Sequence, residues 1–578
     1  MADTKIKAEV ISVFPNKVRI AVNDIEAFKL DEEVLVVGSY LKIFDHKDCS
    51  IIAIIENFSI EIQEPDENGK REKVYIVEAI PLGFLNEENV FIRGGNNIAI
   101  PPKTVEPAKK EDIQKIYDDI EKQSRFCFSK LVLDNSIKVP VDGNKFFNKH
   151  IAIVGSTGSG KSHTLAKIIQ QAISTKNDGY KGLNNSHIVL FDIHDEYKQA
   201  FPTATYIDVD KLKLPYWLMN TEELEEMFLE SGDFNNYNQS SILSRLIVEN
   251  KELNNSGKGK IEYGSPVLFK INEVLNCLVN LSKETKNYKN SDEVSIAGDP
   301  KNFSNDSDKY KHYFKQIYDF EAPKSQNFSK GNYADGSLDK FISRLKNKLS
   351  HKRLKFLFSP DVEKMIFEDV IRQFISYKKG EEANVTIIDL SGVPFEVLSI
   401  TVSLISRILF DYAYFYKKTN INLANETPLL IVYEEAHKYV PKNNLTRYNA
   451  SRFAIERIAK EGRKYGITAV IVSQRPSEIS ETIFSQCNNF ISMRLTNPDD
   501  QNYVKRLLPD TLGPLTETLP MLQAGEALLI GDSVIMPSLV SIDHCDPSPS
   551  SNDIKYLDEW KKQWKDVSFG QLIKKWQE

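Results

Sequence analysis

Residues 155–162, Gly-Ser-Thr-Gly-Ser-Gly-Lys-Ser, have the types and the spacing of a loop that holds the phosphates of a nucleotide. Glycines allow backbone N–H groups to turn inward around phosphate oxygens, and the start of a following helix adds the positive end of its dipole. An apolar run at 151–154 and a helical pattern at 161–173 flank the loop, which is the context that it requires. The alternative is a Gly-rich turn with chance spacing. The predicted nucleotide-binding residues are Gly155, Ser156, Thr157, Gly158, Ser159, Gly160, Lys161, Ser162 and His163.

Two of these residues have side chains suited to distinct parts of ATP. A lysine at the position of Lys161 reaches the β- and γ-phosphates, and a hydroxyl at the position of Ser162 ligates Mg²⁺. The loop therefore predicts ATP and Mg²⁺ as the cofactors.

Two adjacent carboxylates, Glu434 and Glu435, end another apolar run at 429–433. We expect Glu434 to hold the Mg²⁺ shell and Glu435 to polarise the attacking water. A solvated strand end is the alternative. The sequence Glu-Glu-Ala-His at 434–437 lacks the second His that a helical zinc motif needs, so we expect no zinc here.

Two further polar side chains follow apolar runs, and each has two interpretations. Asp192, after the run at 188–191, either orients water beside the nucleotide or caps the next turn. Gln474, after the run at 467–472, either hydrogen-bonds the γ-phosphate or the water and reports hydrolysis, or belongs to a plain turn.

Three arginines, Arg452, Arg457 and Arg463, lie on the helical pattern at 451–465. An arginine aimed at the transferring phosphoryl group accelerates its transfer by about 10³- to 10⁵-fold. If a neighbouring subunit supplies it, the active unit is an oligomer. For any one of the three, a solvated helix face is the alternative.

Elements that position these residues alternate between buried strands and helices. Non-alternating apolar runs joined by helical stretches predict an α/β fold with a mostly parallel sheet. Short β-branched runs, including one at 33–37, predict a small N-terminal barrel or sandwich. The polar tract at 282–336 lacks the apolar residues for a core of its own, so we expect a flexible loop there. The predicted division is 1–105 β-barrel, 106–140 linker, 141–207 and 379–546 ATPase core, 208–378 helical insertion and 547–578 C-terminal tail.

Composition limits the class of protein. The chain has 578 residues, a formal net charge of −7 and five scattered cysteines without a CxxC pair. No apolar run approaches the ~18 residues of a membrane span, and the first residues do not form a signal peptide. We therefore expect a cytoplasmic protein with reduced thiols and without membrane segments. Acidic net charge does not exclude nucleic acid, because a channel can be basic inside an acidic particle.

Eight motifs in order carry a resemblance. They are the phosphate loop and the segments 191–197, 214–219, 387–392, 431–437, 460–466, 473–478 and 494–499. This ordered set resembles the HerA family of HerA/FtsK-type P-loop ATPases over nearly the whole chain. The resemblance implies a RecA-like core, a homohexameric ring and ATP-driven translocation or helicase action on double-stranded DNA. It also implies that Glu435 is catalytic, that Glu434 assists the metal, that Asp192 flanks the site, that Gln474 senses hydrolysis and that Arg463 acts in trans.

The resemblance also implies a partner protein. HerA-like ATPases commonly work with a nuclease in DNA-end processing, or with a nuclease or sirtuin-like effector in antiphage defence, docked on the β-barrel. A second hypothesis is an ATP-gated scaffold ring that assembles and regulates an effector without significant DNA movement. Duplex-stimulated ATPase activity separates the two.

Two segments have open interpretations. The basic stretch Lys340–Lys355 either touches DNA phosphates or is a solvated face over a core stripe. The tail at 553–576 holds three of the four tryptophans, and it either braces a neighbouring subunit or packs on its own core.

Overall fold

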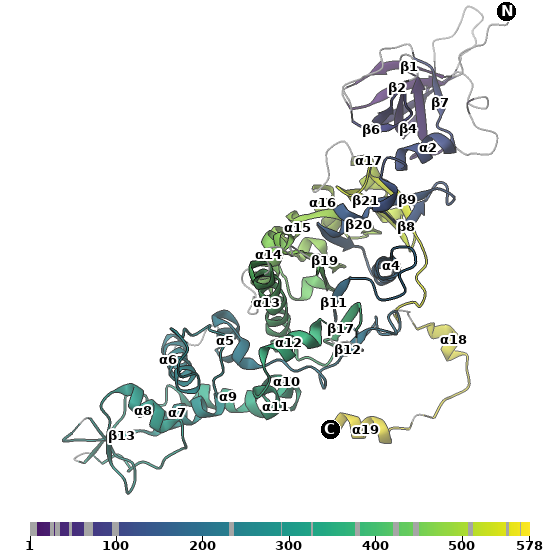
Figure 1. Ribbon diagram of the computed structural model, residues 1–578. Coiled ribbons are helices and arrows are strands. Elements are labelled where there is room, and N and C mark those ends of the chain that lie inside the picture. The colour runs from purple at the N-terminus through teal and green to yellow at the C-terminus, as the bar shows by residue number, and fades with distance from the viewer. Residues whose placement is uncertain are drawn as a thin grey trace, which may run out of the picture.

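The computed structural model describes residues 8–14, 16–22, 28, 35–44, 49–62, 73–94, 103–229, 236–290, 292–324, 327–375, 382–419, 427–442, 450–506, 513–550, 554–566 and 568–577. Figure 1 shows a central α/β body between a small N-terminal sheet and a largely helical projection. All predicted nucleotide-site residues lie within the described part of the chain.

The central sheet has eleven strands in the order β12-β17-β11-β18-β19-β10-β20-β21-β22-β8-β9. Its first seven strands pair in parallel, which confirms the predicted parallel core. They are β12 (Thr205–Ile207), β17 (Val385–Asp389), β11 (His187–Asp192), β18 (Leu429–Tyr433), β19 (Ile467–Ser473), β10 (His150–Val154) and β20 (Cys487–Met493). Four antiparallel strands extend this core: β21 (Glu526–Gly531), β22 (Ser538–Ile542), β8 (Arg125–Leu131) and β9 (Lys138–Asp142).

Parallel order places the carboxyl ends of neighbouring strands at one edge of the sheet. Strand β10 lies between β19 and β20, with Val154 beside Ser473 and Ser492. The phosphate loop after β10 therefore meets the segments that follow β19 and β20. Helices α3 (Gly143–Phe147), α4 (Lys161–Ser174), α13 (Phe395–Thr419), α14 (Ala450–Glu461), α15 (Glu481–Ser485), α16 (Pro498–Arg506) and α17 (Gly513–Glu517) complete the body.

Helix α13 bears on the prediction that no apolar run approaches the length of a membrane span. Of the described residues, only this helix is long and apolar enough to cross a bilayer by length and composition, and 72% of its most apolar window is buried inside the structure. It packs against α14 and against α5 (Thr221–Phe228).

Seven antiparallel strands form the N-terminal sheet. They are β1 (Ala8–Val13), β2 (Val18–Val22), β3 (Tyr40–Phe44), β4 (Ser50–Ile62), β5 (Lys73–Leu85), β6 (Phe91–Arg93) and β7 (Val105–Pro107). Its two outer strands approach one another, since Glu9 bridges to Thr104 and Val10 N donates to Lys103 O at 2.8 Å. Of the strand predicted at 33–37, residues 33–34 lie outside the described residues and 35–37 are not a strand. In the predicted linker, helix α2 (Lys110–Tyr117) leads to the central sheet, where Tyr117 and Ser538 hydroxyls lie 2.9 Å apart.

The insertion is built from short helices and one small sheet. Its helices are α5 (Thr221–Phe228), α6 (Asn236–Asn254), α7 (Ile271–Lys283), α8 (Asp306–Tyr313), α9 (Asp339–Ser350), α10 (Lys355–Phe358), α11 (Pro360–Glu363) and α12 (Phe367–Phe374). Helix α9 buries Ile342 and Leu345 as a core stripe and exposes Lys340 and Lys346, an arrangement that fits both interpretations of the basic stretch.

The polar tract at 282–336 corrects the prediction of a loop. It contains α8 and a four-stranded sheet, β15-β14-β13-β16. These strands are β13 (Thr285–Asn287), β14 (Glu293–Val294), β15 (Lys301–Asn302) and β16 (Phe328–Lys330). The tract gains its apolar contacts by joining the main core, in which Tyr310, Tyr313 and Phe314 are buried.

The C-terminal tail carries helices α18 (Tyr556–Trp560) and α19 (Gly570–Gln577). In Figure 1 it runs away from the body. Its tryptophans are largely exposed: Trp560 by 74%, Trp564 by 96% and Trp576 by 83%. These exposures contradict the interpretation that the tail packs on its own core.

Candidate nucleotide site

The phosphate loop closes tightly on itself between β10 and α4. Gly158 and Gly160 have positive φ values of 72° and 102°, in the left-handed region that glycine adopts without steric cost. A Cβ atom on Gly155 would lie 2.5 Å from Ser159 Oγ and 2.8 Å from Met493 Cβ. The sequence therefore uses glycine where the turn and the close approach require it.

Lys161 begins helix α4 with its ammonium group inside the loop. The side chain is buried, and Nζ donates to Ser156 O at 3.4 Å. Burial lowers the pKa of Lys161, while the charges of Glu435, Glu434 and Glu196 act in the opposite direction. An anionic phosphate beside Nζ would stabilise the ammonium form that burial disfavours.

Glu434 and Glu435 leave the end of β18 and are both buried. Burial, then the negative charge of Glu435, followed by those of Asp192 and Glu196, raises the pKa of Glu434 well above its usual range. Its Oε2 atom accepts no hydrogen bond from any residue that the structure describes. Such an oxygen is suited to a cation, because an unpaired buried carboxylate is costly.

Glu435 occupies a backbone conformation that is rare for a non-glycine residue, with φ 49° and ψ 45°. Strain of this kind often marks functional sites. Glu435 Oε1 accepts a hydrogen bond from Gln474 Nε2, and His437 Nδ1 lies 3.2 Å from Oε2.

Gln474 links this carboxylate to the phosphate loop. While its Nε2 donates to Glu435, its Oε1 accepts from Thr157 Oγ1 at 2.6 Å. Gln474 directly follows β19, whose parallel register with β10 brings the two segments together. The structure thus places the predicted loop, carboxylate and sensor in one continuous hydrogen-bonded arrangement.

Similarity to known proteins covers the part of the chain that holds the phosphate loop. Residues 126–409, which contain the loop, match the family model for the central domain of helicase HerA. The chain is also 28% identical to the DNA double-strand break repair helicase HerA of Saccharolobus solfataricus, over 93% of each chain. The chain belongs to the HerA family of P-loop ATPases. It is an ATP-hydrolysing enzyme.

Other similarities of this HerA-family chain are more distant. It is 24% identical to the probable helicase MJ1565 of Methanocaldococcus jannaschii, covering 93% of this chain and 91% of that one. The solved structure of VirB4 of Thermoanaerobacter pseudethanolicus aligns with a TM-score of 0.45 and 11% identity, over 74% of this chain and 98% of that one.

Asp192 in this HerA-family site has the contacts of a turn cap. Its Oδ1 accepts from His194 N at 3.1 Å and its Oδ2 from Tyr197 N at 3.0 Å. Burial raises the pKa of Asp192, and these backbone N–H groups oppose the rise. Of the two interpretations, the contacts correspond to capping, and the cap holds the segment that carries Glu196.

Ser162 and Glu434 fit the metal that the family implies. Ser162 Oγ donates to Glu196 Oε2 at 2.9 Å, so a carboxylate stands beside the predicted ligand. Within the described residues no group of three or more His, Cys, Asp or Glu could hold a metal ion by itself. Mg²⁺ binds through one or two protein groups together with phosphate oxygens and water, and the Ser162 hydroxyl and the Oε2 atom of Glu434, which has no partner among the described residues, are oxygen ligands of the kind that it takes.

Arg463 lies apart from these residues. It is exposed in the 3₁₀ turn Gly462–Tyr465, which precedes the amino end of β19, whereas Gln474 follows the carboxyl end. The six residue steps of β19 span about 20 Å at about 3.3 Å each. Arg463 therefore does not reach the phosphate loop of its own subunit.

Sequence reasoning missed two contributors to the site. The backbone N–H of Ser550 donates to Glu196 O at 2.8 Å, so the start of the C-terminal tail touches the nucleotide site. Tyr197 places a buried hydroxyl near Glu434 and Ser162. No sequence signal marks Ser550, whereas Tyr197 belongs to the motif at 191–197.

Proposed function

We propose that this HerA-family ATPase is a homohexameric, Mg²⁺-dependent motor or helicase that moves double-stranded DNA and works with a partner nuclease or effector. The observation that carries the proposal is the bridge from Glu435 through Gln474 to Thr157. This bridge connects the group that would position water with the loop that would hold the γ-phosphate, as a coupled ATPase requires.

For hydrolysis, we assign separate tasks to the buried side chains. Lys161 balances charge on the terminal phosphate, and Glu435 accepts a hydrogen bond from the attacking water. Ser162 and Glu434 would hold Mg²⁺, which supplies charge neutralisation at the phosphoryl oxygens. Gln474 exchanges its bond to Thr157 or Glu435 when the γ-phosphate leaves, and so transmits the loss of that phosphate to β19.

If Arg463 acts on the phosphoryl group of a nucleotide, its position requires an oligomer. Because it lies a strand length away from its own loop, it would act on the nucleotide of a neighbouring subunit. The exposed tryptophans of the tail support the same assembly, since they would bury on a second subunit.

DNA is proposed as the substrate because the relatives named above are helicases, one of them for double-strand break repair. The N-terminal sheet, which we interpret as a small barrel, is the proposed docking site for the partner. Its outer surface exposes Ile60 by 54% and Ile62 by 62%, on the end of β4. Such apolar groups favour a protein contact.

The test is ATPase activity with and without blunt duplex DNA over a range of salt concentrations. We expect duplex to raise turnover, and the apparent affinity for duplex to fall with salt at a log–log slope of about −0.9 for each phosphate neutralised. Lys161→Ala is the control for contaminating ATPase. Turnover that is indifferent to DNA, combined with nucleotide-dependent assembly with a partner, would instead support the scaffold-ring hypothesis.

A further inference from the structure

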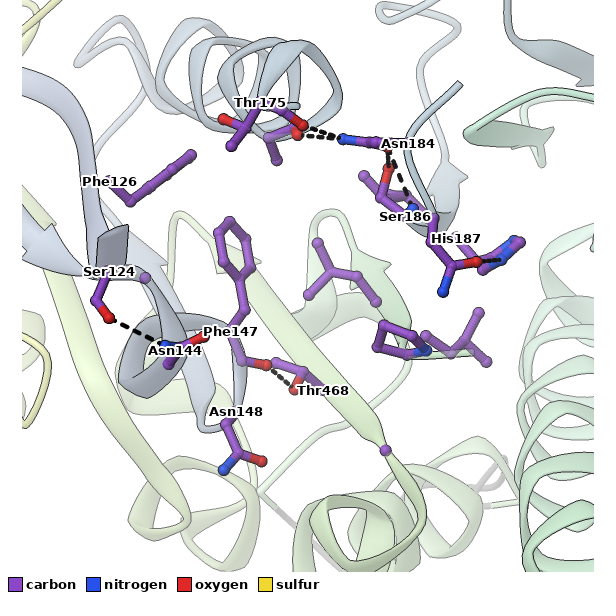
Figure 2. A pocket seen from close by; sticks show the side chains of 18 of the residues that line it. Ser124, Phe126, Asn144, Phe147, Asn148, Thr175, Asn184, Ser186, His187 and Thr468 are labelled. Atoms are coloured by element: carbon purple, nitrogen blue, oxygen red, sulfur yellow. Dashed lines mark hydrogen bonds between the residues drawn. The ribbon is translucent and has the colours of Figure 1, made fainter. Parts of the chain in front are cut away.

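A hollow of about 520 Å³ lies at the opposite edge of the central sheet from the phosphate loop. Figure 2 shows it between α3, the last turn of α4 and the starts of several sheet strands. His187, Leu429 and Thr468 line it from the amino ends of β11, β18 and β19. Because the phosphate loop follows the carboxyl end of β10, the hollow is a separate site from the nucleotide site. Its volume is within the range of about 300 to 1,000 Å³ typical of small-molecule pockets.

Aromatic and aliphatic side chains form much of the wall. The rings of Phe126 and Phe147 meet edge to face with centroids 5.0 Å apart, and Ile188, Leu429 and Leu430 add aliphatic surface. In Figure 2 the ring of Phe147 stands within the hollow. A flat aromatic molecule would therefore find a ring to stack on and an apolar surface to cover it.

Neutral polar groups surround this apolar surface. Asn144 Nδ2 donates to Ser124 Oγ at 3.2 Å, and Asn148 at the rim is exposed, its side chain making no hydrogen bond within the described part of the chain. Burial lowers the pKa of His187, so its ring is neutral at pH 7. Amides and a neutral imidazole offer both donors and acceptors, as the edge of a heterocycle requires.

Charge in the hollow argues against an ionised ligand. Arg125 is the only Lys, Arg, Asp or Glu among the described residues that line it. Its guanidinium is already occupied, since it donates to Ile120 O at 2.7 Å and Asp118 O at 2.8 Å and pairs with the Asp118 carboxylate at 3.3 Å. Among the described residues that line the hollow, the single cation is therefore already paired, and there is no carboxylate to pair with an amine.

We propose that this hollow is a second ligand site, which takes an uncharged planar heterocycle of the nucleobase or nucleoside class. The ring would stack on Phe147, and its polar edge would meet the amides of the rim. The proposal is independent of the motor function, because it uses none of the residues around the phosphate loop.

The test is calorimetric binding of adenosine, guanosine, cytidine and thymidine to the full chain whose ATP site is saturated with a non-hydrolysable ATP analogue. We expect at least one nucleoside to bind, and its 5′-monophosphate to bind more weakly. Phe147→Leu, which keeps an apolar side chain without a ring, should weaken binding by about tenfold. Thr175→Trp, at the exposed end of α4, should narrow the hollow and weaken binding as well.

The matched control is Phe453→Leu, an exposed phenylalanine on α14 that does not line the hollow. It should leave nucleoside affinity unchanged, and the analogue should bind all variants alike. The proposal is overturned if no nucleoside binds while the ATP site is filled, if the monophosphate binds more tightly, or if neither Phe147→Leu nor Thr175→Trp changes the affinity.

Discussion

Gln474→Ala removes the link between the carboxylate that positions water and the phosphate loop. In the structure its amide donates to Glu435 Oε1 and accepts from Thr157 Oγ1 at 2.6 Å. A hydrogen bond to a charged group contributes about 1.5–3 kcal/mol. If that free energy holds Glu435 in its catalytic orientation, the barrier rises by the same amount and kcat falls about 10- to 150-fold.

The assay is steady-state ATP hydrolysis, with ATP binding measured separately. Affinity for ATP should stay within about threefold, because Lys161 and the loop backbone are intact. Gln486→Ala, at an exposed glutamine after α15, is the matched control. Adding Gln474→Ala to Glu435→Gln should cause little further loss, since the two residues act as one unit. Near-normal kcat in Gln474→Ala, or fully additive losses in the double variant, would refute the reasoning.

Three further predictions follow from individual side chains. Gly155→Ala should weaken ATP binding at least tenfold, because the added Cβ meets Ser159 Oγ at 2.5 Å; unchanged affinity in calorimetry would show that the loop yields easily. Because the pKa of Glu434 is raised in the folded state, the folded protein keeps a proton that the unfolded chain releases above pH ~4.5. The free energy of unfolding therefore falls as pH rises from that value toward the raised pKa. Glu434→Gln should flatten this fall in the pH dependence of Tm, and an unchanged slope would contradict the assigned cause. Arg463→Ala subunits mixed with wild-type subunits should reduce ATPase activity by more than their mole fraction, whereas a linear loss would argue against action in trans.

The nucleotide loop could be predicted from sequence because local constraints define it. Glycines, Lys161 and Ser162 stand at fixed spacing between a buried strand and a helix, so the motif and its context coincide. The parallel core was predictable for the same reason, since its strands are continuous apolar runs.

Contacts that depend on three-dimensional register could not be predicted. Gln474 meets Thr157 only because β19 lies beside β10 in a particular register. The left-handed backbone of Glu435 and the contact from Ser550 to the carbonyl of Glu196 likewise have no local sequence signal.

Short elements were missed for another reason. The strands β13, β14 and β15 have the sequences Thr-Lys-Asn, Glu-Val and Lys-Asn, which lack the alternation that identifies a strand. This region has no separate core, and it is stabilised because Tyr310, Tyr313 and Phe314 pack into the main core. Strand β9 was hidden similarly, because Pro140 lies at its centre.

Glu435→Gln tests most directly whether the buried carboxylate beside the phosphate loop drives ATP hydrolysis. The measurement is a single-turnover assay that follows bound ATP and released phosphate on the same sample. We expect this variant to bind ATP with nearly wild-type affinity and to hydrolyse it at least about 10²-fold more slowly, in line with the loss of a positioned base. Hydrolysis at the wild-type rate by Glu435→Gln would contradict the account.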